Sequence, residues 1–300
     1  MKVKRVLVSI VAIAGALALA AAGGARTAAS VLVYSCGPGY ANLCQVNADG
    51  SGLKRLTTDG KAAPFAKRYI SPSLSRDGRK LAYLRGYKLY VLSRATGHRT
   101  GAISNNAWLA RISPDGTKVG DLEQFPSSSG SGWVMTACVF NSNGKGAKAG
   151  RNCEGSTGSF GFTGNNRVLA SVSDQYDPKY GRYEDGVCLL DPVTSGCDKF
   201  VAAQLGYDLS DPALSPNGKL LAVTRSLPGK PEGQIALYGY ATGTLVRTLT
   251  NGTTDAGPVW SPDGSKLAFV RAAKSIYTVK VSGGAPRRLV ASGRAVTWGR

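Results

Sequence analysis

One short phrase recurs along the 300-residue chain and constrains its fold more than any other feature of the sequence. The phrase joins a serine, a turn of the Pro-Asp-Gly type and an alternating apolar stretch. Strong copies lie at 72–83, 110–119, 212–223 and 258–269, with a worn copy at 160–170 and a truncated one at 295–300. The serine, or the residue that replaces it, stands at 75, 113, 163, 215, 261 and 299, so the steps are 38, 50, 52, 46 and 38 residues. Such periods are typical of a four-stranded propeller blade.

The chemistry of the phrase predicts a tight β-hairpin. Proline fixes φ at the first corner, aspartate or asparagine tolerates the second, and glycine adopts the positive φ. The flanking residues alternate and favour β-branched and aromatic types, as strands do. We therefore interpret Asp77, Asp115 and Asp263 as turn formers rather than catalytic carboxylates.

The two ends of the chain predict how the ring closes. Residues 295–298 read as an inner strand with no partners after it, whereas residues 31–57 read as the second, third and fourth strands of a blade. Together they complete a sixth blade, and closure hides the strand edges that an open array would expose. We predict an all-β, six-bladed β-propeller of four-stranded antiparallel blades over residues 30–300. Trp260 and Trp298 occupy matching positions and are expected to pack between blades.

The phrase resembles a known repeat. Ser-Pro-Asp-Gly-Ser-Lys-Leu-Ala-Phe at 261–269 and Asn-Ala-Asp-Gly-Ser-Gly-Leu-Lys-Arg-Leu-Thr at 47–57 are similar to the WD40-like repeats of TolB-type six-bladed propellers. The resemblance covers residues 31–300 and implies an exported binding propeller, on a scaffold that hosts many unrelated sites. We expect no counterpart of the N-terminal α/β domain of TolB, which leaves a TolB-specific role open.

The first 29 residues predict export. Lys2, Lys4 and Arg5 precede an uncharged, mostly apolar run over 6–22 that ends in small residues. These are the marks of a secretory signal peptide. The alternative is an uncleaved N-terminal anchor, for which the run is at the short limit. In either case we expect an extracytoplasmic protein that is secreted, periplasmic or associated with the cell envelope.

Six cysteines fit an oxidising compartment, where an even number suggests disulfides rather than metal binding. Sequence alone allows many pairings. We prefer the nearest-neighbour pairs Cys36–Cys44, Cys138–Cys153 and Cys188–Cys197, because each brackets a glycine-rich turn. A zinc site is disfavoured by the missing C-x-x-C spacing and the single histidine, so we expect neither metal nor cofactor.

The sequence offers no catalytic constellation. G-x-S-x-G, which a serine hydrolase of the propeller-containing peptidases needs, is missing, and His98 falls in a turn. We expect no catalytic residue and no enzymatic activity. The alternative from another class is a polysaccharide lyase or hydrolase with a site in the channel, built on a carboxylate such as Asp208 or Asp211.

Charge is lopsided, with 37 Lys and Arg against 18 Asp and Glu and a net charge of +19. Many cations fall at the hairpin turns, which blade topology sends to one face; they are Arg76, Arg79, Lys80, Lys118, Lys219 and Lys266, with Lys54, Arg55, Lys145, Lys148, Arg287 and Arg288 nearby. This rim predicts either a solvated surface or an electrostatic binder of anionic wall polymer or lipid headgroups. Nucleic acid is not expected for an exported chain without a stacking array.

The opposite face receives the long irregular loops, and variable loops on a rigid scaffold commonly carry function. The loop at 58–69 contains Phe65, Arg68 and Tyr69. The stretch at 174–185 is rich in tyrosine and charge and contains Tyr176, Asp177, Tyr180, Arg182 and Tyr183. Aromatic and arginine side chains of this kind anchor interfaces. We predict that these eight residues bind an envelope protein or peptide, and that the protein is a monomer; the alternative is a loop folded over its own blade.

Overall fold

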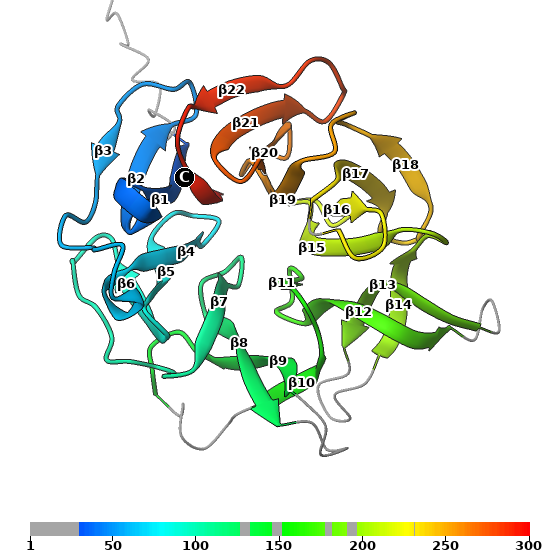
Figure 1. Ribbon diagram of the computed structural model, residues 1–300, viewed down its shortest axis with the longest axis horizontal. Coiled ribbons are helices and arrows are strands. Elements are labelled where there is room, and N and C mark those ends of the chain that lie inside the picture. The colour runs from blue at the N-terminus through cyan, green and yellow to red at the C-terminus, as the bar shows by residue number, and fades with distance from the viewer. Residues whose placement is uncertain (1–29, 127–132, 146–151, 178–181, 191–196, 231) are drawn as a thin grey trace, which may run out of the picture.

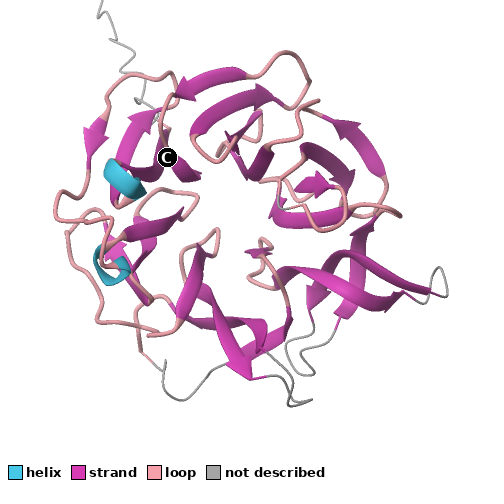
Figure 2. Cartoon of the chain, in the orientation of Figure 1, coloured by secondary structure: helices cyan, strands magenta, loops and turns pink. Residues whose placement is uncertain are grey.

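The computed structural model describes residues 30–126, 133–145, 152–177, 182–190, 197–230 and 232–300. These residues form six antiparallel sheets arranged as a ring about a central axis (Figure 1). Strands dominate, and the described helical elements are two short 3-10 helices, η1 (Pro38–Tyr40) and η2 (Phe65–Lys67) (Figure 2). Among the described residues, we find no helix with the length and apolar character that crossing a membrane requires.

We number the blades from the first complete hairpin. Blade 1 has β4 (Tyr69–Leu74), β5 (Lys80–Arg85) and β6 (Lys88–Ser93); blade 2 has β7 (Ala107–Ile112), β8 (Lys118–Pro126), β9 (Trp133–Asn141) and β10 (Asn152–Ser156). Blade 3 has β11 (Phe160–Phe162), β12 (Val168–Asp177), β13 (Arg182–Leu190) and β14 (Cys197–Ala203); blade 4 has β15 (Asp208–Leu214), β16 (Leu220–Ser226), β17 (Gln234–Gly239) and β18 (Leu245–Thr248). Blade 5 has β19 (Asp255–Trp260), β20 (Lys266–Arg271), β21 (Ser275–Lys280) and β22 (Arg287–Val290). The first strand of each blade faces the axis (Figure 1).

Blade 6 confirms the predicted closure. It combines β23 (Arg294–Gly299) from the C-terminus with β1 (Val31–Cys36), β2 (Asn42–Asn47) and β3 (Lys54–Arg55), in the order β23-β1-β2-β3. β23 runs antiparallel to β1, with Leu32 opposite Trp298. Residues 266 positions apart in the sequence are therefore cross-strand neighbours.

Blade 1 departs from the four-stranded pattern, because its regular sheet has three strands. Its outer segment still follows β6 through isolated bridges that pair Leu89 with Ser104 and Leu92 with Arg99. The backbone of Thr100 donates to Val91 O, and its side-chain oxygen accepts from Val91 N (both 3.0 Å). The Thr100 hydroxyl thus replaces one backbone acceptor of the strand ladder, and the outer segment of blade 1 stays hydrogen-bonded to β6 without forming a continuous strand.

The repeated turns form as predicted, and the serine before each turn explains why it recurs. In blade 2, Ser113 Oγ donates to Asp115 Oδ1 (2.6 Å) and accepts from Lys118 N (2.9 Å), so one hydroxyl bridges both sides of the hairpin. Ser75, Ser215 and Ser261 make the corresponding bonds in blades 1, 4 and 5. Burial works to raise the pKa of Asp115, but hydrogen bonds from Ser113, Asn166 and Thr117 outweigh it and hold the pKa well below its usual value.

Neighbouring blades are joined by buried apolar clusters and by hydroxyl bonds. Trp298 of blade 6 shares one cluster with Ile276 of blade 5, and Trp260 of blade 5 shares another with Ile235 of blade 4, which confirms the predicted inter-blade role of both tryptophans. Buried side-chain oxygens of the inner strands accept backbone N–H groups of the next blade: Ser71 from Ala110 (2.9 Å), Ser73 from Ile112 (3.0 Å) and Thr297 from Leu74 (2.9 Å).

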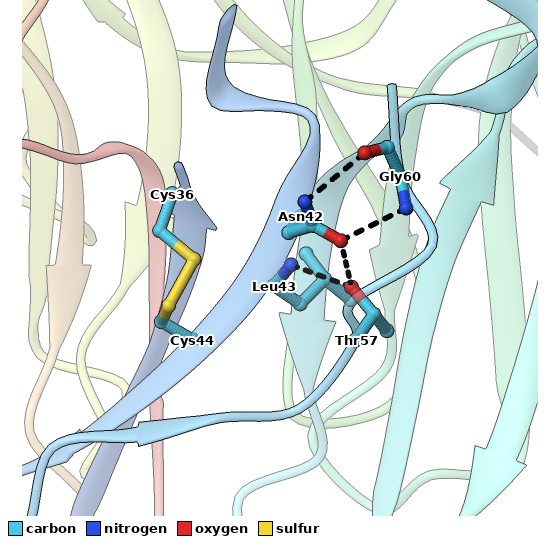
Figure 3. The surroundings of a disulfide bond; sticks show 6 residues. All are labelled: Cys36, Asn42, Leu43, Cys44, Thr57 and Gly60. Atoms are coloured by element: carbon cyan, nitrogen blue, oxygen red, sulfur yellow. Dashed lines mark hydrogen bonds between the residues drawn. A yellow bond between two sulfur atoms is a disulfide. The ribbon is translucent and has the colours of Figure 1, made fainter. Parts of the chain in front are cut away.

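Two of the predicted disulfides are formed within the described residues. Cys36 and Cys44 join β1 to β2 with a Cα–Cα distance of 5.8 Å (Figure 3), and Cys188 and Cys197 join β13 to β14 at 5.4 Å. Cys138 is also disulfide-bonded, and Cys153 lies directly opposite it in the β9–β10 ladder. Such cross-strand placement brings Cβ atoms within disulfide range.

Candidate functional site at the loop face

The ring has two unlike faces. The turn face carries the Ser-Pro-Asp-Gly hairpins and the turns between third and fourth strands. The loop face carries the connections between second and third strands and the crossings between blades. On the axis, a cavity of about 150 Å³ opens toward the turn face between Arg76 and prolines such as Pro114. A second cavity, of about 340 Å³, opens toward the loop face between Ser71, Glu232 and Arg294.

Arg111 and Asp211 line both cavities and mark the middle of the channel. Asp211 has a φ of +51° at a bulge in β15, where its N–H donates to Ser159 Oγ (2.7 Å) and its carboxylate accepts from Thr224 (3.0 Å). Burial lowers the pKa of Arg111, while the negative charge of Asp211 acts in the opposite direction. The channel centre therefore presents one fixed cation and one fixed anion.

Three aromatic side chains form a row on the loop face, which we call the aromatic row: Phe65, Tyr87 and Trp108. The ring centroids of Phe65 and Tyr87 are 4.6 Å apart, and those of Tyr87 and Trp108 are 5.0 Å apart. Tyr87 and Trp108 are 39% and 46% exposed. The guanidinium of Arg68 lies over the Phe65 ring at 5.5 Å. The row spans blades 1 and 2 and offers solvent an apolar surface with a cationic flank.

Backbone contacts of blade 1 assemble the row. Gly86, in the β5–β6 turn, has a φ of +62°, and an added Cβ there would lie 2.7 Å from Ala66 Cα. Its N–H donates to Arg68 O (2.9 Å), so the loop that carries Phe65 packs directly on the turn. On the other side, Ala107 N donates to Tyr87 O (2.8 Å), which places the start of β7 and its Trp108 beside Tyr87.

The loop at 58–69 is also fixed to blade 6, as Figure 3 shows. The side chain of Asn42 donates to Gly60 O (3.2 Å) and accepts from Gly60 N (3.0 Å), satisfying both backbone groups. Thr57 Oγ1 donates to Asn42 (3.1 Å) and accepts from Leu43 N (3.0 Å). An added Cβ at Gly60 would lie 1.9 Å from Ala41 O, so this approach needs glycine. The base of the loop is preorganised, and disulfide Cys36–Cys44 closes the neighbouring hairpin.

The structure separates the three residues predicted in this loop. Phe65 and Arg68 are partly exposed beside the aromatic row. Tyr69 is only 7% exposed, and its hydroxyl donates to Asp59 (3.2 Å) while its ring packs near Tyr83. Burial raises the pKa of Tyr69. Phe65 and Arg68 are thus accessible to solvent, whereas Tyr69 supports the loop from beneath.

The tyrosine-rich segment forms a long hairpin. β12 and β13 have ten and nine residues, against six for β5 and β6, and they extend outward from the ring (Figure 1). Tyr176 pairs with Tyr183, and Asp177 with Arg182, in the backbone register near its end. Tyr180 lies outside the described residues, and so do the side chains of the other four.

Two cations predicted for the turn face form hydrogen bonds inside the ring, Lys80 with the next blade and Lys118 within its own. Lys80 Nζ of blade 1 donates to Gly116 O (2.9 Å) and Ser142 Oγ (3.0 Å) of blade 2. Lys118 Nζ donates to Asn141 (2.8 Å). Arg76 lines the channel, and Lys148 lies outside the described residues. Part of the basic rim therefore stabilises the ring.

The predicted channel carboxylates are in different surroundings. Asp208 accepts from Gly229 N (2.9 Å) and thereby caps the β16–β17 loop. Asp211 faces the channel, where Glu232 lines the same loop-face cavity. His98 is exposed in its turn, as expected. Away from the axis, Asp121, Glu123 and Cys138 place potential ligand atoms within 4.8 Å of one another, but the disulfide at Cys138 removes the thiolate that a metal would need.

A cavity of about 540 Å³ on the loop face lies off the axis between blades 4 and 5. Tyr207, Arg225, Lys230 and Thr253 line it, together with Glu232, which it shares with the channel mouth. No sequence motif pointed to Arg225, which lies on the regular strand β16.

Comparisons with known proteins agree with the architecture. No family model matches the sequence, and no curated protein matches it. TolB of Acinetobacter baumannii has a TM-score of 0.66 at 17% identity, and the match covers 90% of this chain and 66% of TolB. The fold is that of the TolB propeller.

Two further structures share this TolB propeller fold. TolB of Agrobacterium tumefaciens has a TM-score of 0.59 at 16% identity, covering 89% of this chain and 91% of the other. A chain of the nidogen–laminin complex has a TM-score of 0.62 at 8% identity, covering 90% and 98%. The likeness that the repeats predicted is thus confirmed at the level of fold. In length, this chain spans just under two thirds of the A. baumannii TolB chain.

Proposed function

We propose that this protein is an exported binding propeller without enzymatic activity, which recognises an envelope protein or peptide through its loop face. The aromatic row carries the proposal, because Tyr87 and Trp108 leave large rings exposed on a turn and a strand that a backbone hydrogen bond holds together. Aromatic and arginine side chains dominate the energetics of protein interfaces. A surface that is already ordered also loses little conformational entropy when a partner binds.

The proposed surface extends from the row toward the tyrosine hairpin of blade 3. Trp133, at the start of β9 in the intervening blade 2, is 66% exposed. We assign partner contacts to Phe65 and Arg68 of blade 1 and to Tyr176, Asp177, Tyr180, Arg182 and Tyr183 of blade 3. The signal-like N-terminus and the disulfides support an extracytoplasmic partner.

Site-specific cross-linking tests this proposal. A photo-crosslinking residue at Tyr87 should capture a defined partner in cells, whereas the same residue at Leu245, 41% exposed on the outer strand β18, should not. The double substitution Tyr87→Ala and Trp108→Ala should abolish capture from a probe at Arg182 without lowering the melting temperature. Equal capture from positions 87 and 245 would refute the site.

A second candidate function rests on the channel carboxylates. Asp211 and Glu232 line one cavity, and glycoside hydrolysis uses two carboxylates in one cleft. Arg111 would supply a cation for an anionic sugar. Turnover of an anionic glycan that is lost in Asp211→Asn would favour this function over binding alone.

A further inference from the structure

We infer that the off-axis cavity between blades 4 and 5, here the blade-4 pocket, binds a small zwitterionic group that carries a carboxylate and an ammonium. Its volume of about 540 Å³ is within the range of small-molecule sites. This inference goes beyond the proposed function, because it requires no protein partner.

Arg225 is the fixed cation of the pocket. Its Nη2 donates to Gln234 Oε1 (2.7 Å) and its Nη1 to Gln204 Oε1 (3.3 Å), while its guanidinium lies 4.5 Å from the Tyr207 ring centre. The hydroxyl of Tyr238 also donates to Gln204, which holds that amide in place. These neutral partners position Arg225 without neutralising it. Its charge therefore remains available to an anion.

The second charged wall consists of Lys230 and Glu232, whose neighbours Gly229 and Gly233 are held by hydrogen bonds. Asp208 binds the N–H of Gly229, and Gly233 exchanges two backbone hydrogen bonds with Asp255 of blade 5 (both 3.0 Å). An added Cβ at Gly233 would lie 2.1 Å from Arg225 O. Lys230 and Glu232 thus lie between Gly229 and Gly233, the two residues whose backbones are held by hydrogen bonds.

The charges of the pocket are separated. Within the part of the chain that the structure describes, no salt bridge joins Glu232 to Arg225 or Lys230, although all three line the same cavity. An anion alone leaves Glu232 without a counter-ion, and a cation alone leaves Arg225 and Lys230 without one. A ligand with both charges satisfies both walls, and the hydroxyl of Thr253 lines the space between them. A free dipeptide and the C-terminal lysine of a partner chain share this chemistry.

Binding to the purified protein tests the inference with three small probes: Ala-Ala, N-acetyl-Ala-Ala, which lacks the cation, and Ala-Ala-amide, which lacks the anion. Ligand-observed NMR should show saturable binding of Ala-Ala and at least tenfold weaker binding of the other two. N-acetyl-Ala-Ala-Lys and its C-terminal amide then distinguish a free dipeptide from a chain end. Binding of neither Ala-Ala nor N-acetyl-Ala-Ala-Lys, or equal binding of all three small probes, overturns the inference.

Variants locate the site. Glu232→Gln should remove the preference for Ala-Ala over its N-acetyl form, and Lys230→Gln should weaken all carboxylate probes several-fold. Lys219→Gln makes the same charge change on an exposed residue of the turn face and should change nothing. If the protein fails to bind the probes but still captures its partner in cells, the pocket assignment fails while the proposed function stands. Unchanged probe affinities in both pocket variants would place the ligand elsewhere and refute the assignment.

Discussion

Trp298 tests the closure of the ring, because it belongs to the C-terminal strand and packs against the N-terminal one. Its side chain is 6% exposed, Leu32 opposite it is fully buried, and its indole N–H donates to Ser30 Oγ. Replacing a buried tryptophan by alanine costs about 3–5 kcal/mol through lost burial and the cavity left behind. For a chain of this size, a loss of that magnitude lowers the melting temperature by about 5–9 °C.

Thermal and chemical denaturation of Trp298→Ala measure this loss. Trp133→Ala is the matched control, because Trp133 is 66% exposed and its removal should change stability by less than about 0.5 kcal/mol. A Trp298→Ala shift no larger than the Trp133→Ala shift would show that the C-terminal strand is not docked.

A double-mutant cycle separates docking from burial alone. Leu32→Val and Trp298→Phe are milder changes at paired positions, and residues in contact show coupling of about 0.5–3 kcal/mol. Leu221→Val is the control, because Leu221 is equally buried but belongs to blade 4 and should be additive with Trp298→Phe within about 0.5 kcal/mol. Equal coupling in the two cycles would contradict the predicted closure.

Three further predictions concern stability. Replacing Cys36 and Cys44 by serine should lower the unfolding free energy by about 2.5 kcal/mol, since the bridge closes a loop with a sequence separation of 8, and denaturation with and without reductant measures it. Ser73→Ala leaves Ile112 N without its acceptor and should lower the unfolding free energy, measured by chemical denaturation, by about 1–3 kcal/mol. Ser282→Ala changes an exposed serine and is the control; an equal loss of stability in both variants would contradict the inter-blade role of Ser73. The pKa of Asp115 is depressed in the folded state, so its carboxylate stabilises the fold above its unfolded pKa of about 4, and this stabilisation is lost as pH falls through the lower folded pKa. The difference in melting temperature between the unsubstituted protein and Asp115→Asn should therefore narrow in acid. A difference that stays constant with pH would count against this linkage.

The sequence was sufficient to predict the ring because each repeat carries its own turn chemistry. Proline, aspartate and glycine fix each hairpin locally, and the unmatched strands at the two ends leave closure as the way to hide their edges. The repeat pattern identified Asp115 as a turn former, but it marked the serine before the turn without explaining its role. That hydroxyl matters because it binds both arms of the hairpin, which becomes evident only when the arms are placed together.

The candidate site was less predictable, because its residues come together only through packing between blades. Phe65 was identified because it lies in a long loop, but Tyr87 lies in a two-residue turn and Trp108 on a strand, and only packing between blades joins them. Arg225 gave no signal either, since its contacts with Gln234 across the hairpin and with Gln204 of the preceding blade become evident only when the strands are placed together. A large aromatic residue directly after the turn glycine Gly86 was the available hint of an exposed ring.

The closed ring explains why binding should be adjustable without loss of the fold. Each blade buries both of its sides against neighbours, so its inner strands and Ser-Pro-Asp-Gly turns are constrained by packing and hydrogen bonds. The loop face lies outside that constraint, except at anchor points such as Gly60 and Gly233, where a side chain would collide with neighbouring backbone. Substitution between the anchors, at Tyr87 or Lys230, should alter recognition with little change in stability, whereas substitution at an anchor should alter both.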